Sequence, residues 1–171
     1  MTGVRPPTPP SGSGATATVE REDRRDRLGR EAFISLFLTG NRFTEQIEQR
    51  CRVEGISHPQ YTVLWVLCLA DAADGLPMGA LADGLLTRAG DTTRLVDRLL
   101  AAGFVTREPA PGDRRVVLVA PTDEGRALFE RVTAQIKALH REQWGTLTLE
   151  ELRELTRLLN RARMTGAPGA P

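Results

Sequence analysis

The stretch between residues 76 and 119 constrains the fold most, because its hydrophobic period changes from helical to β-type without a long linker. Leu81, Ala82 and Leu85 follow helical spacing from residue 76, and a second helical pattern covers residues 95–100. Gly103 is predicted to end the second helix in the left-handed conformation. The link LLTRAGD between the two patterns is short. Two helices joined in this way match a helix-turn-helix.

Two β-type runs, FVTR at 104–107 and VVLV at 116–119, follow the second helix directly. The segment between them contains Pro109, Pro111 and Gly112, which are typical of a turn. A hairpin in this place is a wing. The alternative is a hairpin that only covers the core, and the arginines near its tip argue against that alternative.

Helical patterns also flank this region on both sides. The first is apolar on one face at three- and four-residue steps and ends near Gly55; its members are Leu28, Ala32, Phe33, Leu36, Phe37, Gly40, Phe43, Ile47 and Cys51. A buried helix begins at Ser57, which has capping-box spacing to Gln60. Two more helices begin at Thr122 and Thr148. The first and last two helices carry more apolar surface than a small core can cover, which predicts a second copy as partner.

The sequence therefore predicts a mainly α chain with a small β-wing: a winged helix-turn-helix with N- and C-terminal dimerisation helices. We expect a disordered tail over residues 1–22, rich in Pro, Gly, Ser and Thr, and another over 164–171. The folded domain should cover residues 23–163. Within it, the winged part spans about 57–120 and the dimerisation helices about 24–54 and 122–163.

Charge is unevenly distributed along the chain, although the formal net charge is only +1. Residues 54–87 contain four acidic residues and no Lys or Arg, whereas residues 88–115 contain six arginines and four acidic residues. Basic residues thus begin where the second helix of the helix-turn-helix begins. Together with the helix-turn-helix and its wing, this distribution favours double-stranded DNA as a partner.

Other classes of protein fit the sequence less well. No apolar run reaches membrane-spanning length and no signal-peptide core is present, so we expect a cytoplasmic protein without membrane contact. Two cysteines and two histidines form no closely spaced pair, and we expect no metal or cofactor. No catalytic triad, paired acidic motif or nucleotide-binding loop is recognisable, so an enzyme is not expected. A winged-helix module that binds protein is the remaining alternative.

Two segments carry a family resemblance, namely TTRLVDRLLAAGFV at 92–105 and DRRVVLVAPTDEG at 113–125. Together with the order of helices from Leu28 to Arg163, they resemble the recognition helix, wing and following helix of the MarR family of bacterial regulators. Pro121, where the family usually has Leu, and the acidic Asp91 depart from the pattern. The resemblance implies a homodimeric transcriptional regulator, a repressor that occludes a promoter at a near-palindromic operator and is released by a small effector.

Residues for DNA binding are expected on the recognition helix and the wing: Arg88, Gly90, Asp91, Thr92, Thr93, Arg94, Arg98, Asp113, Arg114 and Arg115. On the helix, Arg88 and Arg94 should contact bases or adjacent phosphates, since Arg pairs bidentately with guanine in the major groove. Thr92 or Thr93 should contact a phosphate, and Gly90 should allow close backbone approach.

Three of these assignments have alternatives. Asp91 either contacts a cytosine or caps the helix N-terminus. Arg98 either contacts a phosphate or pairs with Asp97 or another nearby acid. In the wing, the resemblance implies that Arg115 reaches into the minor groove and that Asp113 steadies it, with Arg114 as a second contact. The alternative for the wing is a solvated hairpin tip.

The resemblance further implies that small aromatic or anionic molecules bind between the dimerisation helices and the DNA-binding part. Side chains that could line such a site are Phe33, Phe37, Arg42, Phe43, His58, Tyr61 and Trp65. Arg42 or His58 would hold a negative group; plain core packing is the alternative for the aromatic residues. An oxidant switch through Cys51 or Cys68 is the alternative mode of regulation, and it is disfavoured because neither cysteine lies early in the first helix.

Overall fold

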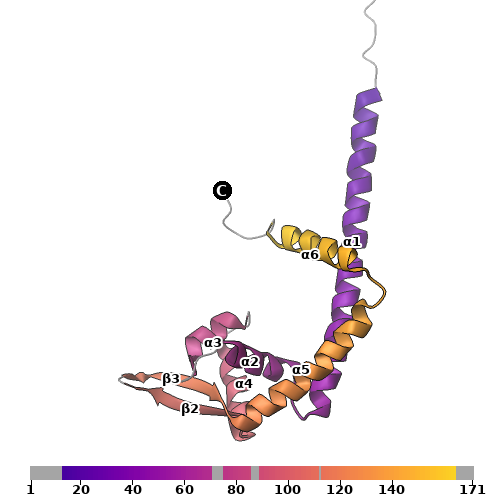
Figure 1. The fold of residues 1–171 in the computed structure, drawn as a ribbon. Coiled ribbons are helices and arrows are strands. Elements are labelled where there is room, and N and C mark those ends of the chain that lie inside the picture. Colours follow the sequence, from indigo (N-terminus) through magenta and orange to yellow (C-terminus); the bar gives the residue numbers. More distant parts are fainter. Residues whose placement is uncertain (1–12, 71–74, 86–88, 112, 165–171) are drawn as a thin grey trace, which may run out of the picture. The chain divides into compact units, whose positions relative to one another are not determined.

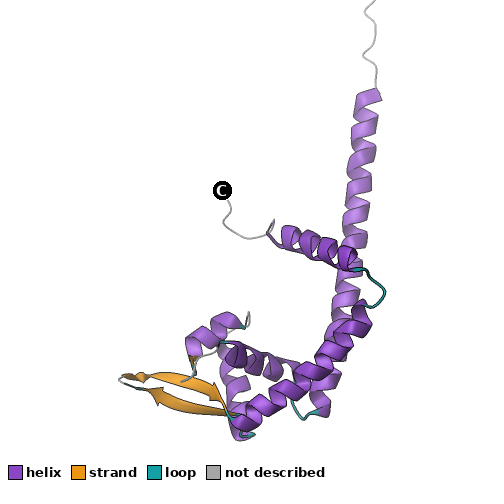
Figure 2. Cartoon of the chain, in the orientation of Figure 1, coloured by secondary structure: helices purple, strands orange, loops and turns teal. Residues whose placement is uncertain are grey.

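The computed structural model describes residues 13–70, 75–85, 89–111 and 113–164. Nine elements follow one another in these residues (Figure 1): α1 (Ser13–Val53), α2 (His58–Leu69), β1 (Leu76–Pro77), α3 (Met78–Gly84), α4 (Ala89–Ala101), β2 (Val105–Ala110), β3 (Asp113–Pro121), α5 (Asp123–Trp144) and α6 (Leu149–Met164). Figure 2 shows a mostly helical chain with one small sheet. The predicted fold class, mainly α with a β-wing, is confirmed.

The first helix is longer than the sequence pattern indicated. It begins at Ser13, inside the segment 1–22 that was expected to be disordered. Residues 15–27 contain neither Gly nor Pro, so nothing stops the helix from extending beyond its amphipathic part. Residues 1–12 and 165–171 lie outside the described part, and the tails expected there stay predictions. The chain divides into two compact units, Met1–Phe43 and Thr44–Pro171.

The second unit contains the hydrophobic core. Its fully buried members include Val63 and Leu64 of α2, Leu99 of α4 and Leu128 of α5. The predicted capping box at the start of α2 is present: the backbone N–H of Ser57 donates to Gln60 Oε1 at 2.9 Å, and that of Gln60 donates to Ser57 Oγ at 3.4 Å. The core therefore joins the helix-turn-helix to the two helices on either side of it in the sequence.

The sheet is antiparallel with the strand order β1-β3-β2. Its hairpin is longer than the two predicted runs, because pairing extends from Val105↔Pro121 to Pro109↔Val117. The prediction of helix from Leu76 is wrong, since Leu76 pairs with Val119 and Pro77 with Leu118 before α3 begins. Two local features explain this start: the residue before a proline favours extended backbone, and Pro in a two-residue edge strand disrupts little.

Large apolar side chains are exposed in the first unit. Six of them, between Leu28 and Leu38 on α1, are 53–66% exposed: Leu28, Phe33, Ile34, Leu36, Phe37 and Leu38. The rings of Phe33 and Phe37 stack with centroids 6.2 Å apart. Helix α6, in the second unit, buries none of its residues. These two helices were expected to need a partner, and within one chain their apolar side chains stay largely in solvent.

Candidate nucleic-acid interface and ligand cavity

Helix α4 divides its side chains between the core and the solvent. Thr92, Val96 and Leu99 lie on one face and are completely buried. Thr93, Arg94 and the other charged side chains of the helix are exposed. This amphipathic arrangement fixes which face of the helix can meet a ligand, because turning it would bring Val96 and Leu99 into water.

The start of α4 excludes one of the two alternatives for Asp91, and the contact with a cytosine stays a prediction. The helix begins at Ala89, so Asp91 lies inside its first turn and is not the N-cap residue. Its carboxylate is exposed and stands at the positive end of the helix dipole. Gly90 belongs to the same turn, whereas Arg88 lies outside the described residues.

The two threonines of this turn have different environments. Thr92 is completely buried, whereas Thr93 is exposed. The Thr92 hydroxyl is buried in the core and cannot reach a DNA phosphate that lies against the protein surface. Of the two predicted alternatives, burial therefore leaves Thr93 as the residue whose side chain can make the contact.

Arg94 and Arg98 are exposed and make no ion pair with a described residue. The suggested pairing of Arg98 with Asp97 is absent, since Asp97 instead accepts from Arg107 of β2 at 2.9 Å. This pair joins α4 to β2. Exposed ion pairs of this kind contribute little stability, so its main effect is on geometry.

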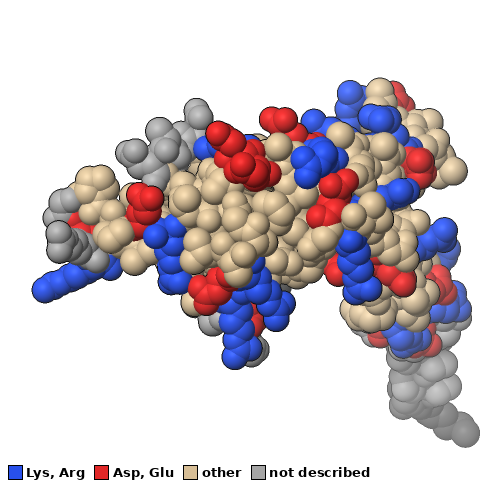
Figure 3. Space-filling model, turned by 90° about the horizontal axis from the view of Figure 1, so that it is seen from below, with Lys and Arg blue, Asp and Glu red and all other residues tan. Residues whose placement is uncertain are grey.

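In the wing, the Asp113 carboxylate accepts a hydrogen bond from the backbone N–H of Arg115 at 2.9 Å. Asp113 and Arg115 are both exposed, and Arg114 follows Asp113 in β3. At the wing end of the space-filling view, a basic side chain projects beyond the surrounding surface (Figure 3). The bond restrains the backbone that carries Arg115. The role of Asp113 in DNA binding that the resemblance implied stays a prediction.

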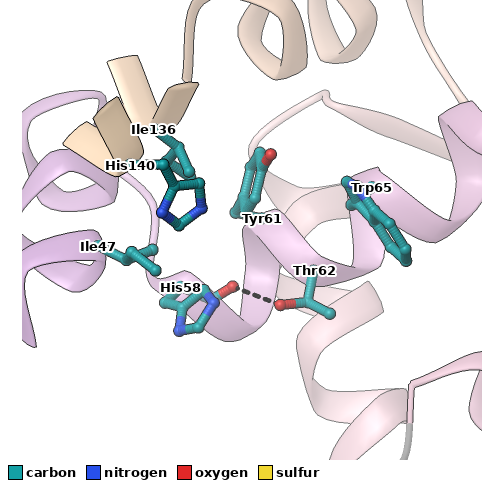
Figure 4. Close-up of a pocket in the computed structure, with 7 residues that line it drawn as sticks. All are labelled: Ile47, His58, Tyr61, Thr62, Trp65, Ile136 and His140. Atoms are coloured by element: carbon teal, nitrogen blue, oxygen red, sulfur yellow. Dashed lines mark hydrogen bonds between the residues drawn. The ribbon is translucent and has the colours of Figure 1, made fainter. Parts of the chain in front are cut away.

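A cavity of about 250 Å³ lies among the end of α1, α2 and α5. Its lining consists of Ile47, His58, Tyr61, Thr62, Trp65, Ile136 and His140. Figure 4 shows the two histidines and Ile47 toward one end and Trp65 at the other, with Tyr61 between them. The cavity thus combines an aromatic side with an end that carries imidazole nitrogens.

Hydrogen bonds and ring stacking hold the Tyr61 side chain and the His58 backbone in place. The Tyr61 hydroxyl lies 3.1 Å from Thr133 Oγ1, and its ring stacks on Phe129 with centroids 5.9 Å apart. The backbone N–H of His58 donates to the Glu48 carboxylate at 2.7 Å. Burial lowers the pKa of His58, and the negative charge of Glu48 opposes this effect. His58 therefore favours the neutral form more than an exposed histidine does.

The sequence identified part of this lining. His58, Tyr61 and Trp65 contribute to the cavity, as proposed for an effector site. Phe33, Phe37, Arg42 and Phe43 belong to the first unit of the chain. The residues that sequence reasoning missed are Ile47, Thr62, Ile136 and His140. Of these additions, Ile47 belonged to the apolar face predicted for the first helix.

Both thiols are in environments that disfavour the thiolate. Cys51 is completely buried, and burial, with a smaller contribution from the charge of Glu48, raises its pKa to about 11. Burial also raises the pKa of Cys68. Because the thiolate is the species that oxidants attack, neither site resembles a reactive cysteine. Among the described residues, no cluster of three or more potential ligands could hold a metal ion, and no helix is long and apolar enough to cross a membrane.

Comparisons with known proteins agree with this architecture. A family model described as MarR family matches residues 54–116. The chain is 30% identical to the transcriptional activatory protein BadR of Rhodopseudomonas palustris, covering 80% of this chain and 78% of BadR. It is 36% identical to the multiple antibiotic resistance protein MarR of Escherichia coli, over 56% of this chain and 67% of that protein.

Solved structures give the same result. A mutant of Escherichia coli MarR, crystallised with operator DNA, superposes with a TM-score of 0.69 at 28% identity, covering 80% of this chain and 93% of the other. AbsC of Streptomyces coelicolor has the same fold, with a TM-score of 0.71 at 22% identity over 80% and 92% of the two chains. The winged helix-turn-helix predicted from the sequence is thus shared with MarR-family transcriptional regulators. The chain belongs to the MarR family of transcriptional regulators.

Proposed function

We propose that this protein acts as a cytoplasmic homodimer that binds a near-palindromic operator, with α4 in the major groove and the wing in the minor groove. The observation that carries the proposal is the division of α4: its buried face fixes its orientation, and its exposed face presents Thr93, Arg94 and Arg98. The similar Escherichia coli protein was crystallised with operator DNA, which supports operator binding by this fold. A dimer places two such helices about one helical turn apart on the duplex.

Each predicted DNA-binding residue has a distinct role in this proposal. Arg94, together with Arg88, contacts bases or adjacent phosphates, while Thr93 and Arg98 contact phosphates. Gly90 allows the backbone to come close to the DNA, and Asp91 selects a cytosine amino group. In the wing, Arg115 enters the minor groove, and the hydrogen bond from its peptide N–H to Asp113 restrains it there. Arg114 contacts the DNA backbone nearby. The buried Thr92 stabilises the helix from the core side.

Regulation is proposed to act through the cavity between α2 and α5. Its aromatic side, with Tyr61 and Trp65, suits a planar ring, and its histidine end suits a carboxylate or another acceptor. A small aromatic or anionic effector that binds the free dimer better than the DNA complex would release the operator. Repression by promoter occlusion is the first candidate for the outcome. Activation is the second, because the similar BadR protein is named as an activator.

Selection from a pool of random duplexes, followed by gel-shift titration of the selected site, tests DNA binding. Binding should weaken steeply with salt as phosphate contacts release counterions. Arg157→Ala is a matched control, since Arg157 lies on α6 and pairs with Glu154 at 2.6 Å. This variant should bind like the original protein. Recovery of no preferred duplex would contradict the proposal and favour a winged-helix module that binds protein.

A second pair of variants separates ligand control from oxidant control. Trp65→Leu should blunt the response of a promoter reporter to inducing compounds more than it weakens operator binding, because Trp65 lines the cavity and is 45% exposed. Cys51→Ala combined with Cys68→Ala should leave both operator affinity and release unchanged. A response lost in the cysteine variant and kept in Trp65→Leu would overturn the ligand proposal and establish the oxidant alternative.

A further inference from the structure

The end of α4, the base of the wing and the start of α5 meet at a single joint. Gly103 ends α4 in the left-handed conformation with φ of +78°, and the backbone N–H of Phe104 returns to the Leu99 carbonyl at 2.9 Å. Val105 then begins β2 opposite Pro121, the last residue of β3. Figure 1 shows α5 starting where α4 and the hairpin come together. The recognition helix and the helix that follows the wing are therefore connected directly.

Thr122 occupies the centre of this joint. Its hydroxyl donates to the Gly103 carbonyl at 2.8 Å and accepts from the backbone N–H of Gly125 at 3.0 Å. Its own backbone N–H donates to the Phe104 carbonyl at 3.1 Å. One residue thus caps the N-terminus of α5 and also binds two successive carbonyls at the end of α4.

Close packing accompanies these bonds. Gly125 is buried, and a Cβ atom added to it would overlap the carbonyl oxygen of Phe104. The first turn of α5 consequently lies directly on the peptide that leaves α4. A backbone-to-backbone contact of this kind has no flexible side chain that could absorb a change in the angle between the two helices.

We propose that Thr122 is a positioning residue for operator recognition, which sets the angle between α4 and α5 and thereby the separation of the two recognition helices in the dimer. The inference rests on the proposed function, because it requires a dimer that reads two half-sites. α5 and the α6 helix that follows it form the C-terminal segment that is expected to dimerise. A fixed angle at the joint therefore becomes a fixed half-site spacing on the DNA.

The test measures spacing tolerance and not affinity alone. The protein is titrated with its selected operator and with versions that have one central base pair inserted or removed. The original protein should prefer the selected spacing by at least about tenfold. Thr122→Val, which is similar in shape but lacks the hydroxyl, should reduce this preference to about threefold or less. Thr122→Ser, which restores a hydroxyl, should recover it.

Two further variants separate positioning from helix capping. Thr148 caps α6 in an equivalent way, accepting from the backbone N–H of Glu151 at 3.2 Å, and Thr148→Val should leave the spacing preference intact. Thr122→Asp retains a capping acceptor but has no proton for the Gly103 carbonyl, so it should relax the preference, and it replaces Thr122→Val if that variant does not fold.

Equal loss of affinity for all three spacings would overturn the role of Thr122, because a purely structural defect lowers the folded fraction without distinguishing operators. If the original protein selects no duplex at all, the proposed function fails first and the inference with it. If the original protein selects an operator but tolerates every spacing equally, only the positioning role fails.

Discussion

Leu99 in α4 and Leu36 in α1 are the same residue type on the apolar face of a helix, and they have opposite environments. Leu99 is completely buried within its own chain, whereas Leu36 is 53% exposed. The difference extends to their surroundings, since the winged part closes a core around Leu99 while the neighbours of Leu36 on α1 are exposed as well.

The comparison shows that the two regions depend on different partners. The winged part satisfies its hydrophobic pattern with contacts inside one chain. The residues between Leu28 and Leu38 on α1 present many exposed apolar side chains, which monomeric proteins seldom leave in water, and α6 by itself also buries none of its residues. A second copy is the simplest partner, which agrees with the homodimer expected for this family. Stability and assembly should therefore respond separately to substitutions in the two regions.

The largest effect is expected in the winged core. Leu99→Ala should lower the free energy of unfolding by about 2–5 kcal/mol, because it leaves a cavity among buried side chains. Urea denaturation followed by circular dichroism measures the change, which should be the same at every protein concentration. Leu36→Ala is the matched variant, and its effect should shrink as the protein is diluted. A concentration-independent loss of equal size for both would erase the difference between the regions.

The second prediction concerns assembly. Phe33 and Phe37 of α1 are stacked and exposed. Replacing both by Glu puts two carboxylates in place of these rings and should prevent dimerisation. Light scattering should then give about the monomer mass of 18.7 kDa, with helix content retained. Val53→Glu serves as control, because Val53 is 77% exposed near the end of the same helix, beside Arg52, and should leave the dimer intact. Persistence of the dimer in the double variant would contradict the assigned interface.

A smaller effect separates two arginines within the winged part. Arg94→Ala should reduce discrimination between operator and random DNA by about 1–3 kcal/mol, because base contacts carry sequence information. Arg115→Ala should weaken binding and lower the preference for A·T-rich flanks. Gel-shift titration against both kinds of DNA measures each change. Equal losses on operator and random DNA for both variants would rule out base contact by Arg94.

The smallest expected effect is a pH dependence from His58. Because burial lowers its pKa in the folded state below the ordinary 6.5, the unfolded chain binds more protons as the pH falls through that value. Stability contributed by neutral His58 is thus present above about pH 6.5 and is lost below it. The melting temperature should fall between pH 7 and pH 5.5, and the fall should be smaller in His58→Gln. An identical fall in both proteins would assign the effect to other groups.

Local chemistry in the sequence was sufficient for much of the fold. The sequence predicts helix ends at Ser57 with Gln60, at Gly103 and at Thr148, and the structure shows a cap or the expected conformation at each. The predicted ends of helices and strands were less accurate where pairing with a distant part of the chain decides them. β1 forms because Leu76 meets Val119, and the hairpin extends beyond its apolar runs because backbone pairing continues to Pro109.

For the DNA-binding surface and the cavity too, the sequence predicted one part and tertiary packing decided the rest. Hydrophobic periodicity, the arginines after residue 88 and the two family-like segments were enough to predict the winged helix-turn-helix and to assign regulation of transcription. Periodicity depends only on near neighbours along the chain, so one sequence determines which face of α4 is apolar. Sequence could not choose between Thr92 and Thr93, exclude Asp91 as the N-cap or bring His140 beside His58 and Trp65. Those outcomes depend on where α4 begins and how α5 packs across α2, and long-range packing alone decides both.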